Sequence, residues 1–177
     1  MSFRIRSALE RDIPSLPDIE RRAAALYCDR AEQFGITPEA LQRVTSEDVL
    51  SCARREGRLW VATITSGEVV GFALVLMVDG LAHLKEVDVL PDHGRQGIGT
   101  ALVRTVCRWA ERHGIPAVTL STFREVPWNA PFYARLGFQP VSPTEVSAGH
   151  VELMDREKDR GLRSDHRVLM RYQTLAG

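Results

Sequence analysis

Apolar and polar residues alternate along this chain with the periods of strands and helices in turn. Period-two or continuous apolar runs predict strands at 3–8, 58–65, 68–78, 82–90, 117–122, 138–141 and 166–172. Amphipathic spacing predicts helices at about 12–27, 46–55, 99–113, 130–136 and 149–160, with an irregular link at 29–46 that holds a helical turn near 38–43. This order of elements predicts an α/β fold.

The segment 86–103 carries the most specific pattern in the chain. An apolar strand ends at Pro91, and an amphipathic helix begins at about Thr100. The loop between them holds Gly94, Gly97 and Gly99. A glycine-rich turn from a strand into a helix presents unpaired backbone N–H groups at the positive end of the helix dipole. The sequence therefore predicts an anion site, most often a phosphate site.

The order of the glycines excludes two common phosphate-binding loops. A dinucleotide fingerprint needs G-x-G-x-x-G, whereas the order here is G-x-x-G-x-G. A P-loop needs a Lys after its last glycine to reach a terminal phosphate, and no Lys follows Gly99 there. A chain of 177 residues also leaves no room for a paired dinucleotide fold beside a substrate domain.

A second motif, in the segment 128–138, indicates which phosphate ligand the loop binds. The loop is similar to the acyl-CoA loop Q/R-x-x-G-x-G/A of the GNAT superfamily of N-acetyltransferases, and the second motif resembles that family's closing F-Y-x-x-x-G-F. The matching residues are Gly97, Gly99, Phe132, Tyr133, Gly137 and Phe138. The leading Gln/Arg of the loop falls on Gly94, which departs from the pattern, although Arg95 and Gln96 supply similar side chains. Without the second motif, the loop would also fit a structural turn with incidental glycines.

The resemblance, which covers roughly residues 60–141, implies a fold and a co-substrate. The implied fold is α/β, with a GNAT-type mixed, centrally splayed β-sheet flanked by helices on both faces. It would form a single acyl-CoA N-acyltransferase domain over residues 1–177. Acetyl-CoA would be the co-substrate, and no metal would be needed.

The family resemblance also implies which residues hold acetyl-CoA. Backbone amides of the loop would surround the pyrophosphate, and these belong to Arg95, Gln96, Gly97, Ile98, Gly99 and Thr100. Pantetheine would pair with the backbone of Val87, Asp88 and Val89, one of whose N–H groups could polarise the thioester carbonyl. An ordinary central strand would explain the same three side chains.

Asn129 is a further candidate for contact with the cofactor. Relatives often have a CoA-contacting Asn seven residues before the Tyr, but here Val126 occupies that place and Asn129 stands four residues before Tyr133. Asn129 would either reach pantetheine through a shortened connection or cap the helix that follows.

Transfer of an acetyl group to an amine also needs an acid for the leaving thiolate. A phenol, with a reference pKa of about 10, can protonate a thiolate whose thiol titrates at about 8.5. The family's motif carries a Tyr in this role, and the matching residue is Tyr133. The alternative is a core Tyr that satisfies a backbone carbonyl.

The amine needs a base, and Glu86 is the predicted one. Related enzymes often carry a carboxylate near the end of this strand, whereas Ser121 occupies the position on the following strand where other relatives carry it. Asp88 and His83 compete with Glu86 for the role. A salt bridge from Glu86 to a neighbouring Arg or Lys is the structural alternative.

Other conspicuous residues have mainly structural interpretations. An acceptor pocket would be lined by Trp128, Phe123 and Arg124, or Trp128 would instead anchor a loop. Cys107 is expected to pack, because no activating base accompanies it in the sequence. The run from Glu152 to Arg167 alternates in sign, which fits a solvated helix face.

Composition narrows the class of protein. The 23 basic and 23 acidic residues balance, so no attraction to nucleic acid or to a membrane is indicated. No membrane span and no signal-peptide core are found. Three cysteines without metal or redox spacing favour buried, reduced thiols in a cytoplasmic protein.

Together these observations predict an N-acetyltransferase that moves the acetyl group of acetyl-CoA to a primary amine by direct attack in a ternary complex. The predicted acceptor is a small molecule such as an amino acid, a polyamine or an amino-sugar antibiotic. A protein N-terminus or lysine is the alternative acceptor, and a non-catalytic acyl-CoA-binding regulatory module is the alternative function. Homodimers are common in such families, so a homodimer remains open.

Overall fold

Within residues 2–175, which the computed structural model describes, seven strands form one sheet in the order β1-β2-β3-β4-β5-β7-β6. The strands are β1 (Phe3–Ser7), β2 (Leu59–Ile64), β3 (Val69–Val78), β4 (Leu81–Val89), β5 (Ala117–Phe123), β6 (Gln139–Pro140) and β7 (Arg167–Gln173). β4 and β5 run parallel, whereas β1 and β2, β2 and β3, β5 and β7, and β6 and β7 are antiparallel. This mixed sheet, flanked by helices, confirms the predicted α/β fold class.

The helices lie close to their predicted places. The α-helices are α1 (Leu16–Ala24), α2 (Pro38–Leu41), α3 (Glu47–Arg55), α4 (Ile98–Arg112), α5 (Ala130–Arg135) and α6 (Ala148–Asp159). The 3-10 helices are η1 (Glu10–Ser15), η2 (Ala25–Arg30), η3 (Glu32–Phe34), η4 (Pro91–His93), η5 (Pro143–Glu145) and η6 (Ser164–His166). The single helix predicted at 12–27 is divided into η1, α1 and η2. Pro14 lies inside η1 and Pro17 in the first turn of α1, where the missing N–H of proline is tolerated.

The chain divides into two compact units. The first comprises Met1–Leu26, Gln42–Leu76 and Leu84–Val106, and the second comprises Tyr27–Leu41, Met77–His83 and Cys107–Gly177. Strand β4 therefore begins in the second unit and ends in the first. No helix within residues 2–175 is long and apolar enough to cross a membrane.

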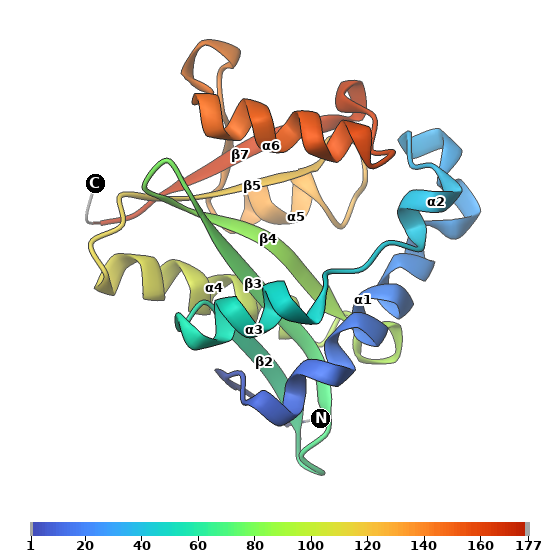
Figure 1. Ribbon diagram of the computed structural model, residues 1–177, viewed down its shortest axis with the longest axis vertical. Coiled ribbons are helices and arrows are strands. Elements are labelled where there is room, and N and C mark those ends of the chain that lie inside the picture. Colours follow the sequence, from blue (N-terminus) through green and yellow to red (C-terminus); the bar gives the residue numbers. More distant parts are fainter. Residues whose placement is uncertain (1, 176–177) are drawn as a thin grey trace. The chain divides into compact units, whose positions relative to one another are not determined.

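The core of the first unit lies around β2 and β3. Consecutive residues of both strands are buried, which explains their continuous apolar sequence, because a strand covered on both faces has no polar side. Helix α3 lies beside η1 and β2 (Figure 1) and buries Leu50 completely. At the start of α1, Leu16 is likewise fully buried.

In the second unit, β5 and β7 lie side by side and α6 runs along them (Figure 1). A separate apolar cluster forms beside them from Phe34, Ile36, Phe123 and Val126. Two of these residues come from the link at 29–46, which contains η3 and α2 and therefore holds the predicted helical turn near 38–43.

A buried chain of polar groups connects α6 to β5 and β4 within the second unit. Thr119 Oγ1 lies 3.1 Å from Nδ1 of His83 and 2.8 Å from Nε2 of His150. Nδ1 of His150 lies 2.7 Å from Oγ of Ser147, which in turn hydrogen-bonds Asp79. His83 and Thr119 are each 1% exposed and His150 is 2% exposed.

Asp79, at the exposed end of this series of polar groups, fixes the direction of each hydrogen bond. A carboxylate only accepts, so Ser147 donates to Asp79 and accepts from Nδ1 of His150. Neutral His150 then accepts at Nε2 from Thr119, which itself accepts from Nδ1 of His83. We therefore assign both histidines as Nδ1–H tautomers. Burial lowers the pKa of His150 below its ordinary 6.5, which agrees with the neutral form.

This lowered pKa predicts an acid-sensitive step in stability. The contribution of neutral His150 is complete above its ordinary pKa of 6.5 and declines as the pH falls through the lower pKa of the folded state. The free energy of unfolding, measured by urea denaturation, should therefore fall less steeply between pH 7 and 5 in His150→Gln than in the wild type. His113→Gln, at an exposed position, is the matched control. An unchanged slope in His150→Gln would contradict the assignment.

Candidate active site

The loop after β4 is an exposed turn that leads directly into α4. Residues 94–97 are exposed, whereas Ile98 is 2% exposed and anchors the helix in the core. The backbone turns at Arg95 and Gly97, whose φ angles are 58° and 84°. A Cβ at Gly97 would meet nothing within 4 Å, so glycine is required there by the left-handed conformation alone.

The first turn of α4 presents its N–H groups at this loop. Ala101 N–H donates to Gly97 O at 3.0 Å, which places the amides of Ile98, Gly99 and Thr100 at the open end of the helix. The helix begins at Ile98, slightly before the predicted start. Aligned peptide dipoles make this end partly positive, so the geometry fits the predicted anion site.

Short contacts within the first unit hold the loop in shape. Gly94 N–H donates to Pro91 O at 3.0 Å, and Gln96 Nε2 donates to Asp92 O at 3.4 Å. The Asp92 carboxylate lies 3.8 Å from the Arg22 guanidinium of α1. These contacts join residues within the loop and also connect the loop to α1.

Glu86, the predicted base, forms the salt bridge that was its structural alternative. Its Oε1 lies 2.6 Å from Nζ of Lys85. The same ammonium donates to Thr45 Oγ1 at 3.0 Å. Glu86 is half-buried, and its carboxylate is thus already engaged by a cation.

Glu20 is a titratable residue at this strand that the sequence analysis missed. Its carboxylate accepts the backbone N–H of Thr45 at 2.8 Å and lies 3.3 Å from the Thr45 hydroxyl. Burial, followed by the negative charge of Glu86, raises its pKa to about 7. A signal was present in the sequence, because Glu20 falls at i+4 from Leu16, within the buried stripe of α1.

Asp88 lies on the same strand as Glu86, two residues farther along. Burial of its carboxyl, then the charges of Glu86 and Glu20, raise its pKa well above the usual value. Its buried Oδ2 has no hydrogen-bond partner among the described residues. Val87 and Val89, the other predicted pantetheine contacts, are half-buried.

In the second unit, Tyr133 lies on α5 between aromatic rings. Its ring meets Phe132 at 5.0 Å and Phe138 at 5.8 Å, both at interplanar angles of 66°. Pro131 stands in the first turn of α5, and Gly137 ends the helix with φ of 97°, as the sequence predicts.

Asn129 stands at the N-cap position of α5, but its side chain makes no capping bond. Nδ2 donates to the Tyr27 hydroxyl at 2.9 Å, and the same hydroxyl lies 3.2 Å from Oδ1. Asn129 is 8% exposed. Its contact with pantetheine stays a prediction, and the side chain would exchange its bonds to Tyr27 to make one.

Ser121, which occupies the position where some relatives have a carboxylate, is hydrogen-bonded to a carboxylate from another element. Its hydroxyl donates to Oε2 of Glu157 on α6 at 2.7 Å, and Arg167 lies 2.9 Å from the same oxygen. Arg167 also donates to Ser121 O at 3.0 Å and lies 4.7 Å from the centre of the Phe123 ring. The prediction that the run 152–167 is a solvated face is therefore wrong for Glu157 and Arg167, because their inward ion pair links α6 to β7.

The cysteines differ from the prediction in part. Cys28 and Cys52 are exposed, and Cys107 alone of the three is buried. Burial raises the pKa of Cys107 to about 12, which keeps the thiol protonated and supports its packing role. Trp128 is 42% exposed and its ring lies 6.0 Å from that of Tyr27, so it anchors its loop while keeping one face accessible.

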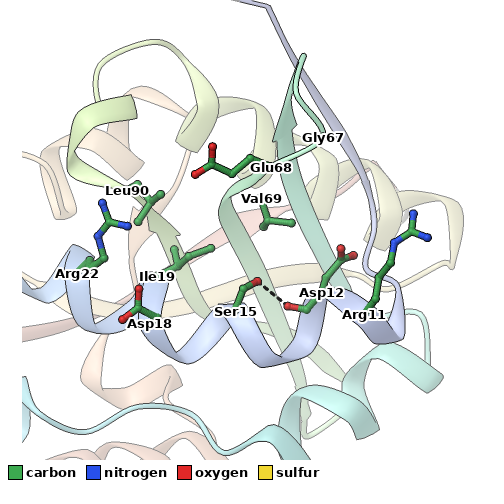
Figure 2. Close-up of a pocket in the computed structure, with 10 residues that line it drawn as sticks. All are labelled: Arg11, Asp12, Ser15, Asp18, Ile19, Arg22, Gly67, Glu68, Val69 and Leu90. Atoms are coloured by element: carbon green, nitrogen blue, oxygen red, sulfur yellow. Dashed lines mark hydrogen bonds between the residues drawn. The ribbon is translucent and has the colours of Figure 1, made fainter.

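A hollow of about 470 Å³ lies in the first unit near the loop (Figure 2). Side chains from η1 and α1 form one wall, and the β2–β3 turn and the end of β4 form the other. Its lining residues are Arg11, Asp12, Ser15, Asp18, Ile19, Arg22, Gly67, Glu68, Val69 and Leu90. None of the predicted site residues is among them. Within residues 2–175, no group of three or more His, Cys, Asp or Glu could hold a metal ion.

Solved structures share this fold. Over 99% of this chain and 97% of the other, the chain superposes on the ribosomal-protein-S18-alanine N-acetyltransferase of Escherichia coli, with a TM-score of 0.67 and 21% identity. The PaiA N-acetyltransferase of Thermoplasma acidophilum, solved in complex with coenzyme A, gives a TM-score of 0.68 at 15% identity over 98% of this chain and 99% of that one.

Sequence comparisons point the same way. The S-(2-succino)cysteine N-acetyltransferase of Bacillus subtilis (strain 168) is 28% identical over 90% of this chain and 98% of its own length. The uncharacterized N-acetyltransferase YobR of the same organism is 29% identical over 68 residues, and the chain spans 28% of its length. The model of the Acetyltransferase (GNAT) family matches residues 23–138. The chain therefore belongs to the GNAT family of acetyltransferases.

Proposed function

We propose that this protein transfers the acetyl group of acetyl-CoA to the primary amine of a small-molecule acceptor, by direct attack in a ternary complex. The observation that carries the proposal is the exposed loop at 94–97, which leads into the open N-terminus of α4. Its glycines at 94 and 97 leave backbone N–H groups accessible, as a pyrophosphate requires. A relative of the same fold was solved in complex with coenzyme A.

The end of β4 supplies the second part of the proposed cofactor site. Leu90 N–H donates to Val70 O of β3 at 2.9 Å. Backbone groups two residues apart face the same side of a strand, so Asp88 N–H is also directed toward β3. The amides of Val87 and Val89 then face the opposite edge. These two are the proposed partners of pantetheine, and one of them would polarise the thioester carbonyl.

Acetyl-CoA supplies a thioester whose carbonyl carbon accepts the amine. A base on the protein removes one proton from the acceptor's ammonium, and a backbone N–H of β4 stabilises the oxyanion. Tyr133 gives its phenolic proton to the sulfur as the carbon–sulfur bond breaks. The nitrogen, now bonded to the acetyl carbon, loses a second proton, which restores Tyr133.

A small acceptor is supported by the relative that matches almost the whole chain, whose name specifies an S-substituted cysteine. Release of thiol from acetyl-CoA tests this, with S-(2-succino)cysteine, spermidine, kanamycin and a peptide with N-terminal alanine as acceptors. Fast release with the peptide alone would favour a protein acceptor. Binding of coenzyme A without thiol release from any amine would favour a regulatory module. A cytoplasmic location and a homodimeric state stay predictions.

The conformation of Gly97 predicts a specific loss of cofactor binding. In Gly97→Ala, a side chain in the left-handed region costs about 1–2 kcal/mol, and the loop would relieve that strain by moving its amides. The dissociation constant for coenzyme A, measured by calorimetry, should rise about tenfold.

Gly67→Ala is the matched control, because Gly67 has a φ of 88°, also has open space around its Cβ position, and lies in the β2–β3 turn. This control should lose comparable stability and bind coenzyme A normally. Equal affinities in Gly97→Ala and the wild type would contradict the proposed loop.

The proposed acid role of Tyr133 predicts a loss of turnover without a loss of binding. Tyr133→Phe should lower kcat by about 100-fold or more, because the thiolate then leaves without a proton donor. Its affinity for coenzyme A should not change. Tyr172→Phe is the control, since Tyr172 packs on the same Phe138 ring at 5.5 Å. If both variants lose the same factor in kcat, the acid role is wrong.

A further inference from the structure

Three carboxyl groups of the first unit lie near one ammonium. Glu20 comes from α1, whereas Glu86, Asp88 and Lys85 come from β4. The charge of Glu86 raises the pKa of both other carboxyls, and the charge of Lys85 lowers them. We call these four side chains the carboxyl cluster. Since its members influence one another, their individual contacts decide which of them can take up a proton.

Two of the three carboxyls are poorly placed to act as a base. Oε1 of Glu86 is held by Lys85 at 2.6 Å, so this oxygen is already bonded to a cation. Burial raises the pKa of Asp88 well above its usual value, so its charged form is disfavoured. Its buried Oδ2 also has no hydrogen-bond partner among the described residues, so no donor orients this oxygen.

Glu20 is held in a different way. Thr45 donates two hydrogen bonds to the Glu20 carboxylate, from its backbone N–H at 2.8 Å and from its hydroxyl at 3.3 Å. That hydroxyl accepts from Lys85 at 3.0 Å, so its own proton is directed toward Glu20. Glu20 is thus oriented by neutral donors. A carboxylate accepts up to four hydrogen bonds, so lone pairs remain for a substrate.

We propose that Glu20 is the general base of the acetyl transfer, with Lys85 and Thr45 as the residues that position it. This inference rests on the proposed function, because it names the group that deprotonates the acceptor. In the step, the Glu20 carboxylate takes one proton from the acceptor's ammonium. The freed lone pair forms the nitrogen–carbon bond, and Glu20 later releases its proton to solvent. Glu86 then has an electrostatic role.

The ionisation of Glu20 supports this assignment. A base works best when its pKa lies near the working pH, and burial with the charge of Glu86 brings that of Glu20 to about 7. Glu86 raises this value, so its removal should lower it. Lys85 lowers it, so removal of Lys85 should raise it. These opposite signs distinguish Glu20 from Glu86. Asp88 has the same signs and is distinguished by its own variant, Asp88→Asn.

The test is the pH profile of kcat/KM for acetyl-CoA with the fastest acceptor of the panel above. In the wild type the acid limb should fall near pH 7. Glu20→Gln should lower kcat/KM at pH 7 by about 100-fold or more. It should also replace the limb by a rise of tenfold per pH unit up to the pKa of the acceptor's own amine, about 10.4 for a lysine-like amine and about 8 for an α-amine, because only neutral amine reacts without a base.

Single variants of the cluster give different signatures for each candidate. With Glu20 as base, Glu86→Gln keeps turnover and moves the acid limb to lower pH, and Lys85→Met moves it to higher pH. Were Glu86 the base, Glu86→Gln would lose turnover at pH 7. Were Asp88 the base, Glu20→Gln would stay active, with its limb moved to lower pH, and Asp88→Asn would lose turnover. The acceptor's own ionisation is the same in every variant and cancels in the comparison.

Asp18→Asn is the matched control, because Asp18 lies on the same helix and its side chain is 60% exposed. It should leave the profile unchanged. Circular dichroism and coenzyme A binding check that each variant is folded; if Glu20→Gln is not, the opposite shifts in Glu86→Gln and Lys85→Met, together with retained turnover in Asp88→Asn, decide. A folded Glu20→Gln with wild-type kcat/KM at pH 7 would overturn the proposal. If the wild type releases no thiol with any amine, the proposed function fails first, and the base role fails with it.

Discussion

The proposed cofactor site depends on a set of backbone N–H groups at the start of α4 that have no carbonyl partner within their own helix. Every α-helix begins with such groups, but α4 exposes them at the end of a central strand, behind a glycine-containing loop. Gly97 allows the turn that leaves them open, and buried Ile98 fixes the helix start. A negatively charged ligand is the natural partner for this arrangement, because it satisfies the amides and the helix dipole together.

Much of the local structure around the proposed site residues could be predicted from the sequence because its parts are contiguous. The glycines and the apolar strand before them lie within a few residues, as do Pro131, Tyr133 and Gly137 around α5. Local signals of this kind need no knowledge of tertiary contacts: proline fits a first helical turn and glycine fits a left-handed cap. The same reason explains why the helix and strand boundaries lie close to their predicted places.

The sequence failed where charged residues come together from distant segments. Glu157 and Ser121 are separated by 36 positions, yet they share a hydrogen bond, and the alternating charges around Glu157 resemble those of an ordinary solvated helix. Glu20 reaches Thr45 across 25 positions. Periodicity marks such a residue as lying on a buried stripe, but it cannot say which partner compensates its charge. Likewise, Cys28 and Cys52 are exposed, although the lack of metal or redox spacing predicts buried thiols.

The two missed carboxylates also show why a carboxylate alone does not indicate a base. Glu157 is bonded to Arg167, which is 9% exposed, and to Ser121, so its negative charge is compensated and its oxygen Oε2 is occupied. Glu20 has Glu86 as a near neighbour, and its charge is disfavoured by burial and by repulsion. Such an arrangement reduces stability, since replacing a repelled carboxylate would relieve the folded state. A bound ammonium would relieve the same repulsion, so the charge distribution of the cluster favours a cationic acceptor over a neutral one.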